Sequence, residues 1–181
     1  MTHPKDILER VLLTREQIEG RVKELAAEIS RDYAGKDLVL ISVLKGGVIF
    51  LADLTRLLTI LHSYDLVGAS SYLGKTKSSG EVRLTKDVDL EIKNKHVLLI
   101  EDIYDSGATL VFLKDILQVH SPASIEVCSF LDKEKKHKHH VKVRYVGFHI
   151  PDVFVVGYGL DFQELYRNLD CIGVLKPEIY E

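Results

Sequence analysis

Residues 101–109 hold a dense group of polar side chains directly after the apolar run at 97–100. The amphipathic stretch at 110–120 predicts a helix, so this turn lies at a helix N-terminus. Unpaired N–H groups and the helix dipole make such a terminus attractive to an anion, and the hydroxyls of Ser106 and Thr109 add donors. Gly107 would let the backbone approach a bound phosphate closely. These residue types therefore predict a phosphate site at this turn.

Three carboxylates in the same turn need a separate explanation, because Glu101, Asp102 and Asp105 would repel a phosphate. Sugar hydroxyls, a Mg²⁺ ion or a transferable proton would each give a carboxylate a favourable partner there. A structural alternative is that Asp105 and Ser106 only cap the helix. Capping does not explain Glu101 and Asp102, which are two adjacent acids at the end of an apolar strand.

The elements that must position this turn follow from hydrophobic periodicity. Helical spacing predicts helices over 16–33, 48–62, 110–120 and 161–169. Apolar runs predict strands over 38–44, 64–71, 81–84, 96–100, 124–131, 153–156 and 171–175. Strands that alternate with helices indicate an α/β fold, with a mostly parallel central sheet flanked by helices on both faces. Ligands bind such folds at the carboxyl ends of the strands, where the 101–109 turn would lie.

Composition sets further limits. The 181 residues include 24 Lys+Arg and 27 Asp+Glu, a formal net charge of −3, and 46% are hydrophobic. This balance excludes wholesale disorder, and the lack of a basic excess argues against a nucleic-acid binder. No repeat or linker divides the sequence, so we expect one domain over 1–181. No long apolar run and no signal-peptide pattern occur, and Cys128 and Cys171 lie in apolar strands. We therefore expect a cytoplasmic protein with no membrane partner.

The 101–109 turn resembles the ribose-5-phosphate loop of the type I phosphoribosyltransferases, which use phosphoribosyl pyrophosphate (PRPP). Three further segments resemble the hypoxanthine–guanine branch of this family, in family order, within about residues 38–175. They are the pyrophosphate loop at Val43-Leu44-Lys45-Gly46-Gly47, the flexible loop at Ser70-Ser71-Tyr72 and 76–80, and the purine and metal segment at 152–161. The spellings Leu131-Asp132-Lys133 and Tyr158-Gly159-Leu160-Asp161 are similar to bacterial members.

The resemblance implies the type I phosphoribosyltransferase fold, with a core at about 38–150 and a small hood lobe from about 1–15 and 151–181. It implies an enzyme of purine salvage that transfers the 5-phosphoribosyl group of PRPP to N9 of hypoxanthine, and of guanine, with release of pyrophosphate. It also implies Mg²⁺ as cofactor and a homodimer or homotetramer.

On the PRPP side, the resemblance makes Asp105 the general base, or hydrogen-bond partner, at purine N7. Glu101 and Asp102 would hold the ribose hydroxyls, directly or through Mg²⁺-bound water. The backbone that would cradle the 5′-phosphate belongs to Asp105, Ser106, Gly107, Ala108 and Thr109. The residues that would hold the pyrophosphate are Lys45, Gly46 and Arg167.

On the purine side, the resemblance makes Lys133 a donor to the 6-oxo group and Phe154 a stacking partner of the base. Val155 would contact the purine edge through its backbone. Asp161 would take part in the purine site and would ligate Mg²⁺, as would Glu101 and Asp102. A mobile loop at 72–80, with Ser71 and Tyr72 at its start, would close and exclude water.

Several of these side chains also have a purely structural explanation. Lys133 could belong to a solvated loop, and Phe154 could be a core residue. Arg167 could be a surface partner of Glu164, and Asp161 could cap the predicted 161–169 helix. For residues 135–140, which are rich in Lys and His, we prefer a solvated loop to a metal or anion site.

Two other functions fit parts of the sequence. Residues 69–76 approach the Walker A pattern, but Ala69 stands at the first Gly position and 77–82 show no helical period, which argues against a P-loop ATPase or kinase. The second alternative is a PRPP-binding regulatory protein of the same fold that binds RNA or DNA. The net charge of −3 and the presence of Asp105, Lys133, Phe154 and Asp161 favour the enzyme.

Overall fold

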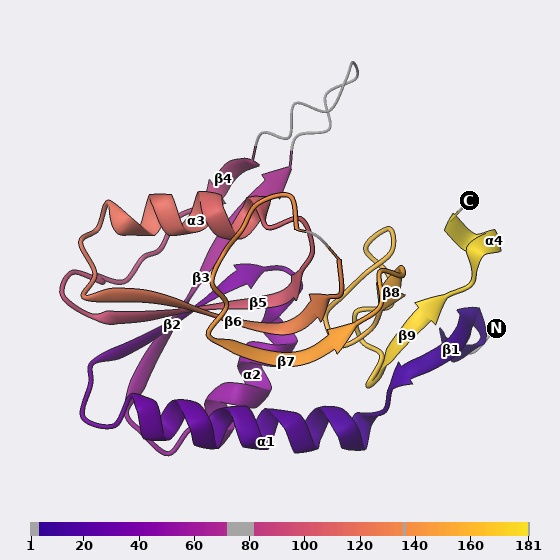
Figure 1. Cartoon of the computed structure of the whole chain (residues 1–181), viewed down its shortest axis with the longest axis horizontal. Helices are drawn as coiled ribbons and strands as arrows, with labels where there is room; N and C mark the ends of the chain where they lie inside the picture. Colours follow the sequence, from indigo (N-terminus) through magenta and orange to yellow (C-terminus); the bar gives the residue numbers. More distant parts are fainter. Residues whose placement is uncertain (1–3, 72–81, 136, 181) are drawn as a thin grey trace.

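The computed structural model describes residues 4–71, 82–135 and 137–180. Its centre is a six-stranded sheet in the order β4-β3-β2-β5-β6-β7 (Figure 1). The strands are β2 (Leu38–Leu44), β3 (His62–Ser71), β4 (Val82–Lys86), β5 (His96–Tyr104), β6 (Ser124–Lys133) and β7 (Tyr145–Ile150). Neighbouring strands pair in parallel, except β3 with β4. The predicted mostly parallel α/β sheet is confirmed.

Helices cover both faces of this sheet, as predicted. Helices α1 (Arg15–Asp32) and α2 (Gly47–Leu57) lie on one face and α3 (Ala108–Gln118) on the other (Figure 1). Strand β2 explains the arrangement, since Leu38 and Leu40 join the core beside α1 and α2 while Val39 and Ile41 join the core beside α3. A strand buried on both faces has the continuous apolar sequence seen here. None of the helices in the described ranges has the length and apolarity needed to cross a membrane.

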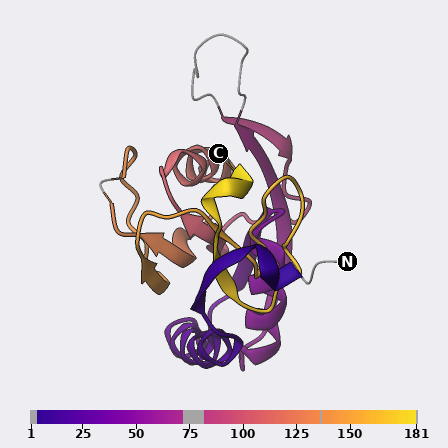
Figure 2. The ribbon, with the colours of Figure 1, turned by 90° about the vertical axis from the view of Figure 1, so that its right-hand side faces the viewer.

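The two ends of the chain meet in a second, three-stranded sheet in the order β1-β9-β8. It contains β1 (Leu8–Leu13), β8 (Val155–Val156) and β9 (Ile172–Leu175), flanked by η1 (Pro4–Ile7) and α4 (Pro177–Tyr180). Figure 2 shows β1 and the C-terminal segment side by side at the front of the molecule. This sheet joins segments that were predicted to form the hood, while the division into a core and a hood stays a prediction.

Helix α2 is shorter than the predicted 48–62 helix. Leu58 takes an extended conformation, with φ −67° and ψ 133°, so the helix ends at Leu57. The prediction was wrong beyond this point, because Leu61 is 95% exposed and has no core to pack against. The following residue, His62, already begins β3.

Residues 161–169 form no helix, so this prediction was also wrong. Gln163, Glu164 and Tyr166 have φ values of 52°, 66° and 73°. Left-handed backbone at three positions interrupts any right-handed helix. The segment is instead held by the polar contacts of the site described below.

Other strand limits differ from the predictions. Strand β5 runs past Ile100 to Tyr104, so Glu101 and Asp102 lie within a strand rather than in a turn. Strand β8 is shorter than the predicted 153–156 strand and leaves Phe154 outside. Strands β1 and β7 were missed. Both contain polar or small residues where an apolar run would have been recognised, and each is completed by pairing with a distant strand, β9 or β6.

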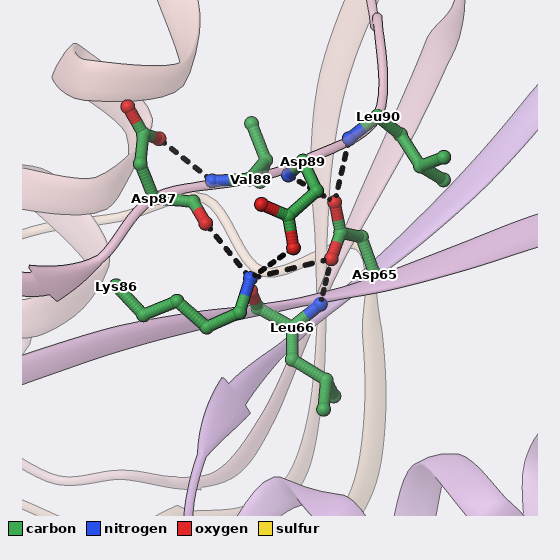
Figure 3. Close-up of polar contacts among 7 residues, drawn as sticks. All are labelled: Asp65, Leu66, Lys86, Asp87, Val88, Asp89 and Leu90. Atoms are coloured by element: carbon green, nitrogen blue, oxygen red, sulfur yellow. Dashed lines mark hydrogen bonds and ion pairs between the residues drawn. The ribbon is translucent and has the colours of Figure 1, made fainter.

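Near the edge of the central sheet, Asp65 on β3 contacts Lys86 on β4 and the residues that follow β4 (Figure 3). Its carboxylate accepts from the N–H groups of Leu66, Asp89 and Leu90 at 2.7, 2.6 and 2.9 Å. Nζ of Lys86, at the end of β4, lies 3.6 Å from the same carboxylate and donates to Asp89 and to backbone carbonyls. Burial alone would raise the pKa of Asp65, but these N–H donors and Lys86 lower it below its ordinary value.

We expect Asp65→Asn to destabilise the protein in a pH-dependent way. Because the pKa of Asp65 is lower in the folded state, its stabilisation is full above the unfolded-state pKa of about 4 and is lost as the pH falls through the folded-state value. Urea unfolding should show a deficit of about 1–2 kcal/mol near neutral pH that shrinks below about pH 3. The exposed residue Asp37 supplies the control Asp37→Asn, and an equal deficit at both pH values would contradict the charge argument.

Candidate active site

The candidate site lies at the carboxyl edge of the central sheet, where the loops after β2, β5 and β6 meet. The loop after β5 ends at Gly107, whose φ of +85° precedes the first turn of α3. A Cβ at this position would lie 2.1 Å from the carbonyl oxygen of His139, so only glycine fits. A small cavity of about 60 Å³ opens here, lined by Glu101, Ile103, Tyr104, Asp105, Ser106, Gly107, Thr109 and Leu110.

Helix capping explains little of this loop. The N-cap residue is Gly107, and it makes no side-chain cap hydrogen bond. Ser106 Oγ accepts from the N–H of Ala108 at 3.3 Å, but the carboxylate of Asp105 faces two lysines instead. The capping alternative is therefore wrong for Asp105.

Glu101 and Asp102 form an acidic pair near the end of β5, in which Glu101 is buried and Asp102 is partly buried. Glu101 is only 7% exposed, and its Oε2 makes no hydrogen bond with the residues that the structure describes. Burial raises its pKa well above the ordinary value, and the adjacent Asp102 raises it further. Burial also raises the pKa of Asp102, against the opposing effects of a hydrogen bond with Glu101, the Ile103 N–H and the Arg167 charge. Two adjacent carboxyl groups shielded from water are costly, which marks this pair as a candidate functional site.

Two glycines bring other segments onto Asp102. A Cβ on Gly46 would lie 1.5 Å from Oδ2 of Asp102, and a Cβ on Gly159 would lie 2.0 Å from the carbonyl oxygen of Gly46. The loop after β2, which begins at the cis peptide Leu44–Lys45, therefore packs between β5 and the segment 157–161. Gly46, Asp102 and Gly159 are far apart in the sequence, and the fold brings them into contact.

Arg167 organises the segment that failed to form a helix. Its guanidinium lies 2.7 Å from Oδ1 of Asp161 and 3.4 Å from Oε1 of Glu164, and it donates to the carbonyl of Gly159 at 2.8 Å. Nζ of Lys45 lies 2.7 Å from Oε2 of Glu164. The predicted Arg167–Glu164 pair therefore exists, but it forms part of a cluster that joins the two loops with predicted pyrophosphate contacts. Asp161 accepts from the N–H of Glu164 and caps no helix.

Asp105 and Lys133 face one another across the site. Nζ of Lys133 lies 3.6 Å from Oδ2 of Asp105 and 3.3 Å from Oδ1 of Asp152, and the lysine side chain is only 12% exposed. Lys135 contacts both of these carboxylates as well. Hydrogen bonds from Lys135 and Lys133 hold the pKa of Asp152 below its ordinary value. Lys133 is thus a packed side chain and does not belong to a solvated loop.

The remaining predicted residues lie at the rim or outside the described residues. Phe154 is 39% exposed and meets the ring of Phe162 edge-on at 5.9 Å, so it is not a buried core residue. Val155 is buried in β8. Ser71 ends β3, and Tyr72 and the rest of the predicted loop at 72–80 lie outside the residues that the structure describes.

Residues 135–140 were predicted to be a solvated loop, and for two of them this was wrong. Lys135 joins the Asp105 and Asp152 carboxylates. The ring of His137 stacks on Tyr104, with centroids 3.6 Å apart and planes at 16°. Lys135 and His137 lie in a loop, where no periodic pattern predicts a contact, and Tyr104 lies at the end of β5. The sequence alone therefore did not reveal these contacts.

Carboxylates can ligate a metal ion, and cations can hold a sugar phosphate. Within the part of the chain that the structure describes, no three His, Cys, Asp or Glu side chains converge as a metal-binding group. Asp161 is engaged by Arg167, and Oε2 of Glu101 makes no hydrogen bond with these described residues. Any ion here would need oxygen ligands beyond the protein, which is how Mg²⁺ is commonly bound beside phosphates.

We expect Glu101→Gln to stabilise the ligand-free protein at high pH. The raised pKa means that the folded state holds the Glu101 proton more tightly, so wild-type stability falls as the pH rises from about 4 toward the folded-state value. Glutamine has no charge to bury, and urea unfolding in the presence of a chelator at about pH 8 should show a gain of about 1–3 kcal/mol.

At about pH 3 the two proteins should differ little, since Glu101 is then mostly protonated in both states. The exposed Glu91 provides the matched control Glu91→Gln, for which no such pH-dependent gain is expected. A Glu101→Gln variant that is less stable than the wild type at about pH 8 would contradict the argument.

Comparison with known proteins gives consistent likenesses. A family model described as "Phosphoribosyl transferase domain" matches residues 11–163. The chain is 48% identical over 173 residues to a hypoxanthine-guanine phosphoribosyltransferase of Staphylococcus aureus, covering 96% of this chain and 97% of that protein. A crystal structure of a hypoxanthine phosphoribosyltransferase from Staphylococcus aureus superposes with a TM-score of 0.92 at 47% identity, covering 97% of this chain and 96% of the other. One of a hypoxanthine-guanine phosphoribosyltransferase from Bacillus anthracis gives 0.88 at 45% identity, covering 93% and 99%.

Proposed function

This chain belongs to the phosphoribosyl transferase domain family, and we propose that it is a hypoxanthine phosphoribosyltransferase of purine salvage. It transfers the 5-phosphoribosyl group from PRPP to N9 of hypoxanthine, and of guanine, and releases pyrophosphate. The observation that carries the proposal is the pairing of Asp105 with Lys133, whose charged atoms lie 3.6 Å apart beside the phosphate loop. Purine N7 and O6 are neighbours on one edge of the base, and a proton acceptor beside a cationic donor matches that edge.

Asp105 is proposed as the general base. As N9 of the base forms its bond to C1′ of the ribose, the bond from C1′ to the pyrophosphate oxygen breaks, and the N7 proton passes to the Asp105 carboxylate. Positive charge develops on the ribose during this displacement, and the carboxylates of Glu101 and Asp102 stabilise that charge electrostatically. They also accept from the ribose hydroxyls, and the loop from Asp105 to Thr109 holds the 5′-phosphate with backbone N–H groups.

Lys45, Arg167 and the backbone of Gly46 are proposed to hold the pyrophosphate. In the ligand-free protein their cationic groups are joined through Glu164, which lies 2.7 Å from Lys45 and 3.4 Å from Arg167. Glu164 is a surface carboxylate, so pyrophosphate can replace it at little cost. The exposed ion pair thus keeps both cations beside Gly46 until the more highly charged ligand arrives.

A Mg²⁺ ion is proposed to bind through Glu101, Asp102 and Asp161. The fit rests on the buried Oε2 of Glu101, which makes no hydrogen bond with any residue in the described ranges, and on the oxygen ligands that Mg²⁺ prefers. When bound, the ion would neutralise charge on the departing pyrophosphate. Among the described residues these three carboxylates do not converge on one point. Mg²⁺ often takes only one or two carboxylates together with substrate phosphates, so its other ligands would come from PRPP.

The purine site favours a 6-oxo group over a 6-amino group. Lys133 donates to an oxo oxygen but meets the amino group of adenine with donor against donor, which costs on the order of 1–3 kcal/mol. Phe154 offers an exposed ring face for stacking, and the backbone of Val155 contacts the purine edge. The net charge of −3 argues against the RNA-binding or DNA-binding alternative.

The cellular context is proposed on weaker grounds of composition and family. Cys128 and Cys171 are buried thiols, which suits a reducing cytoplasm. We propose a homodimer or homotetramer that works on small molecules, without a nucleic-acid or membrane partner.

The function can be tested by supplying PRPP and Mg²⁺ with each base separately. We expect turnover of hypoxanthine and guanine, and a kcat/KM for adenine lower by about 10-fold or more because of the unpaired donors at Lys133. No turnover of any 6-oxopurine would refute the enzyme, and salt-dependent RNA binding in its place would favour the regulatory alternative.

Asp105→Asn should lower kcat by about 100-fold or more, because the amide cannot accept the N7 proton. The matched control is Asp115→Asn, an exposed acid on α3, which should leave kcat unchanged. An unchanged kcat in the Asp105 variant would remove this residue from proton transfer.

A further inference from the structure

A short segment, residues 137–141, packs behind the candidate phosphate loop on the side away from the cavity. The N–H of His139 donates to the carbonyl of Ser106 at 2.9 Å. Tyr104 Oη donates to the carbonyl of His139 at 3.0 Å and accepts from the N–H of Val141 at 3.1 Å. The same carbonyl of His139 fills the space that a side chain on Gly107 would need. The loop after β5 and residues 137–141 are therefore joined by these hydrogen bonds and by the close contact at Gly107.

The side chain of His137 contacts the backbone of Asp105. Its Nδ1 lies 2.5 Å from the Asp105 carbonyl oxygen. Because a carbonyl oxygen only accepts, Nδ1 is the donor. Nε2 lies 2.9 Å from Oδ1 of Asp132, and the ring stacks on Tyr104. The side chain is only 11% exposed. Its contacts with Asp105, Asp132 and Tyr104 together hold the ring in place.

These contacts orient two peptide groups. In a planar trans peptide the C=O of one residue and the N–H of the next point in opposite directions. When His137 draws the Asp105 carbonyl toward residues 137–141, the N–H of Ser106 must point away from them, and the His139 N–H does the same for the N–H of Gly107. Neither of these two N–H groups has an acceptor among residues that the structure describes. Both residues line the small cavity beside the loop after β5.

We propose that His137 is a positioning residue that holds the Asp105–Ser106 peptide plane in the orientation that binds the 5′-phosphate of PRPP. This inference rests on the proposed function, because PRPP is the ligand that the site is proposed to bind. His137 touches neither substrate nor reacting atom and acts through the backbone of Asp105. Its expected effect is on PRPP affinity more than on the chemical step.

Two amide substitutions separate the contacts of the His137 ring. The amide nitrogen of Asn occupies nearly the position of Nδ1, and that of Gln the position of Nε2. His137→Asn therefore keeps the donor to Asp105, whereas His137→Gln places its amide nitrogen beside Asp132 and loses that donor. His140, an exposed histidine of the same loop, gives the control His140→Ala.

The experiment measures the Kd of PRPP with Mg²⁺ by calorimetry, and the KM values of PRPP and hypoxanthine by initial rates. We expect His137→Ala and His137→Gln to raise the Kd and KM of PRPP about 10-fold, the loss of one hydrogen bond that orients a donor to an ionic group. His137→Asn should stay within about 2-fold of the wild type, and His140→Ala should match it. The KM of hypoxanthine should change little in all four.

Equal PRPP affinity in the wild type and His137→Ala would overturn the proposal, as would rescue by Gln in place of Asn. A variant that folds poorly lowers the melting temperature and the active fraction, but it does not reproduce the split between Asn and Gln. A wild-type chain that binds PRPP without turnover would refute the proposed function alone, and the calorimetric comparison would still decide the role of His137. A wild-type chain that binds no PRPP would overturn both.

Discussion

The carboxylate of Asp102 occupies the space that any side chain at residue 46 would need, and most of the site depends on this close approach. A Cβ on Gly46 would lie 1.5 Å from Oδ2 of Asp102, and a Cβ on Gly159 would lie 2.0 Å from the carbonyl oxygen of Gly46. Three segments from distant parts of the sequence are thereby held in direct contact. The acids of β5, the turn after β2 and the segment that carries Asp161 thus lie against one another.

Charge is distributed in layers around this contact. The floor holds the buried acids Glu101 and Asp102, whose pKa values are raised by burial. The rim holds cations that are already paired with carboxylates, as Lys133 is with Asp105 and Arg167 is with Asp161. Placing acids where they are costly is typical of sites whose ligand brings compensating charge. A net charge of −3 is therefore compatible with a phosphate-binding protein, because the proposed anion contacts come from backbone N–H groups and a few placed cations.

The sequence predicted what local patterns encode. The almost entirely apolar strand β2 was placed at its observed limits, and the turn at 101–109 was located as the main chemical feature because its residue types have no simple structural use. The family resemblance and the fold class are confirmed, whereas the individual residue roles stay predictions. The failures share a physical cause. Residues 161–169 have helical spacing, yet contacts of Lys45 and Arg167 with Glu164 hold a left-handed turn that local propensity disfavours. His137 likewise gains its surroundings from Tyr104 and Asp132 on neighbouring strands, which no spacing rule reveals.

The terminal sheet also determines the order in which the protein can be completed during synthesis. Strand β1 is synthesised before the central sheet, but its partner β9 is made only after the whole central sheet. Chains fold largely in the order in which they are synthesised, so the loop after β5 and its sheet can form while β1 still has an open edge. The segment with Phe154, Asp161 and Arg167 follows the central sheet, and its start is held by the pairing of β8 with β9. A nascent chain would thus complete the proposed phosphate site before the proposed purine site.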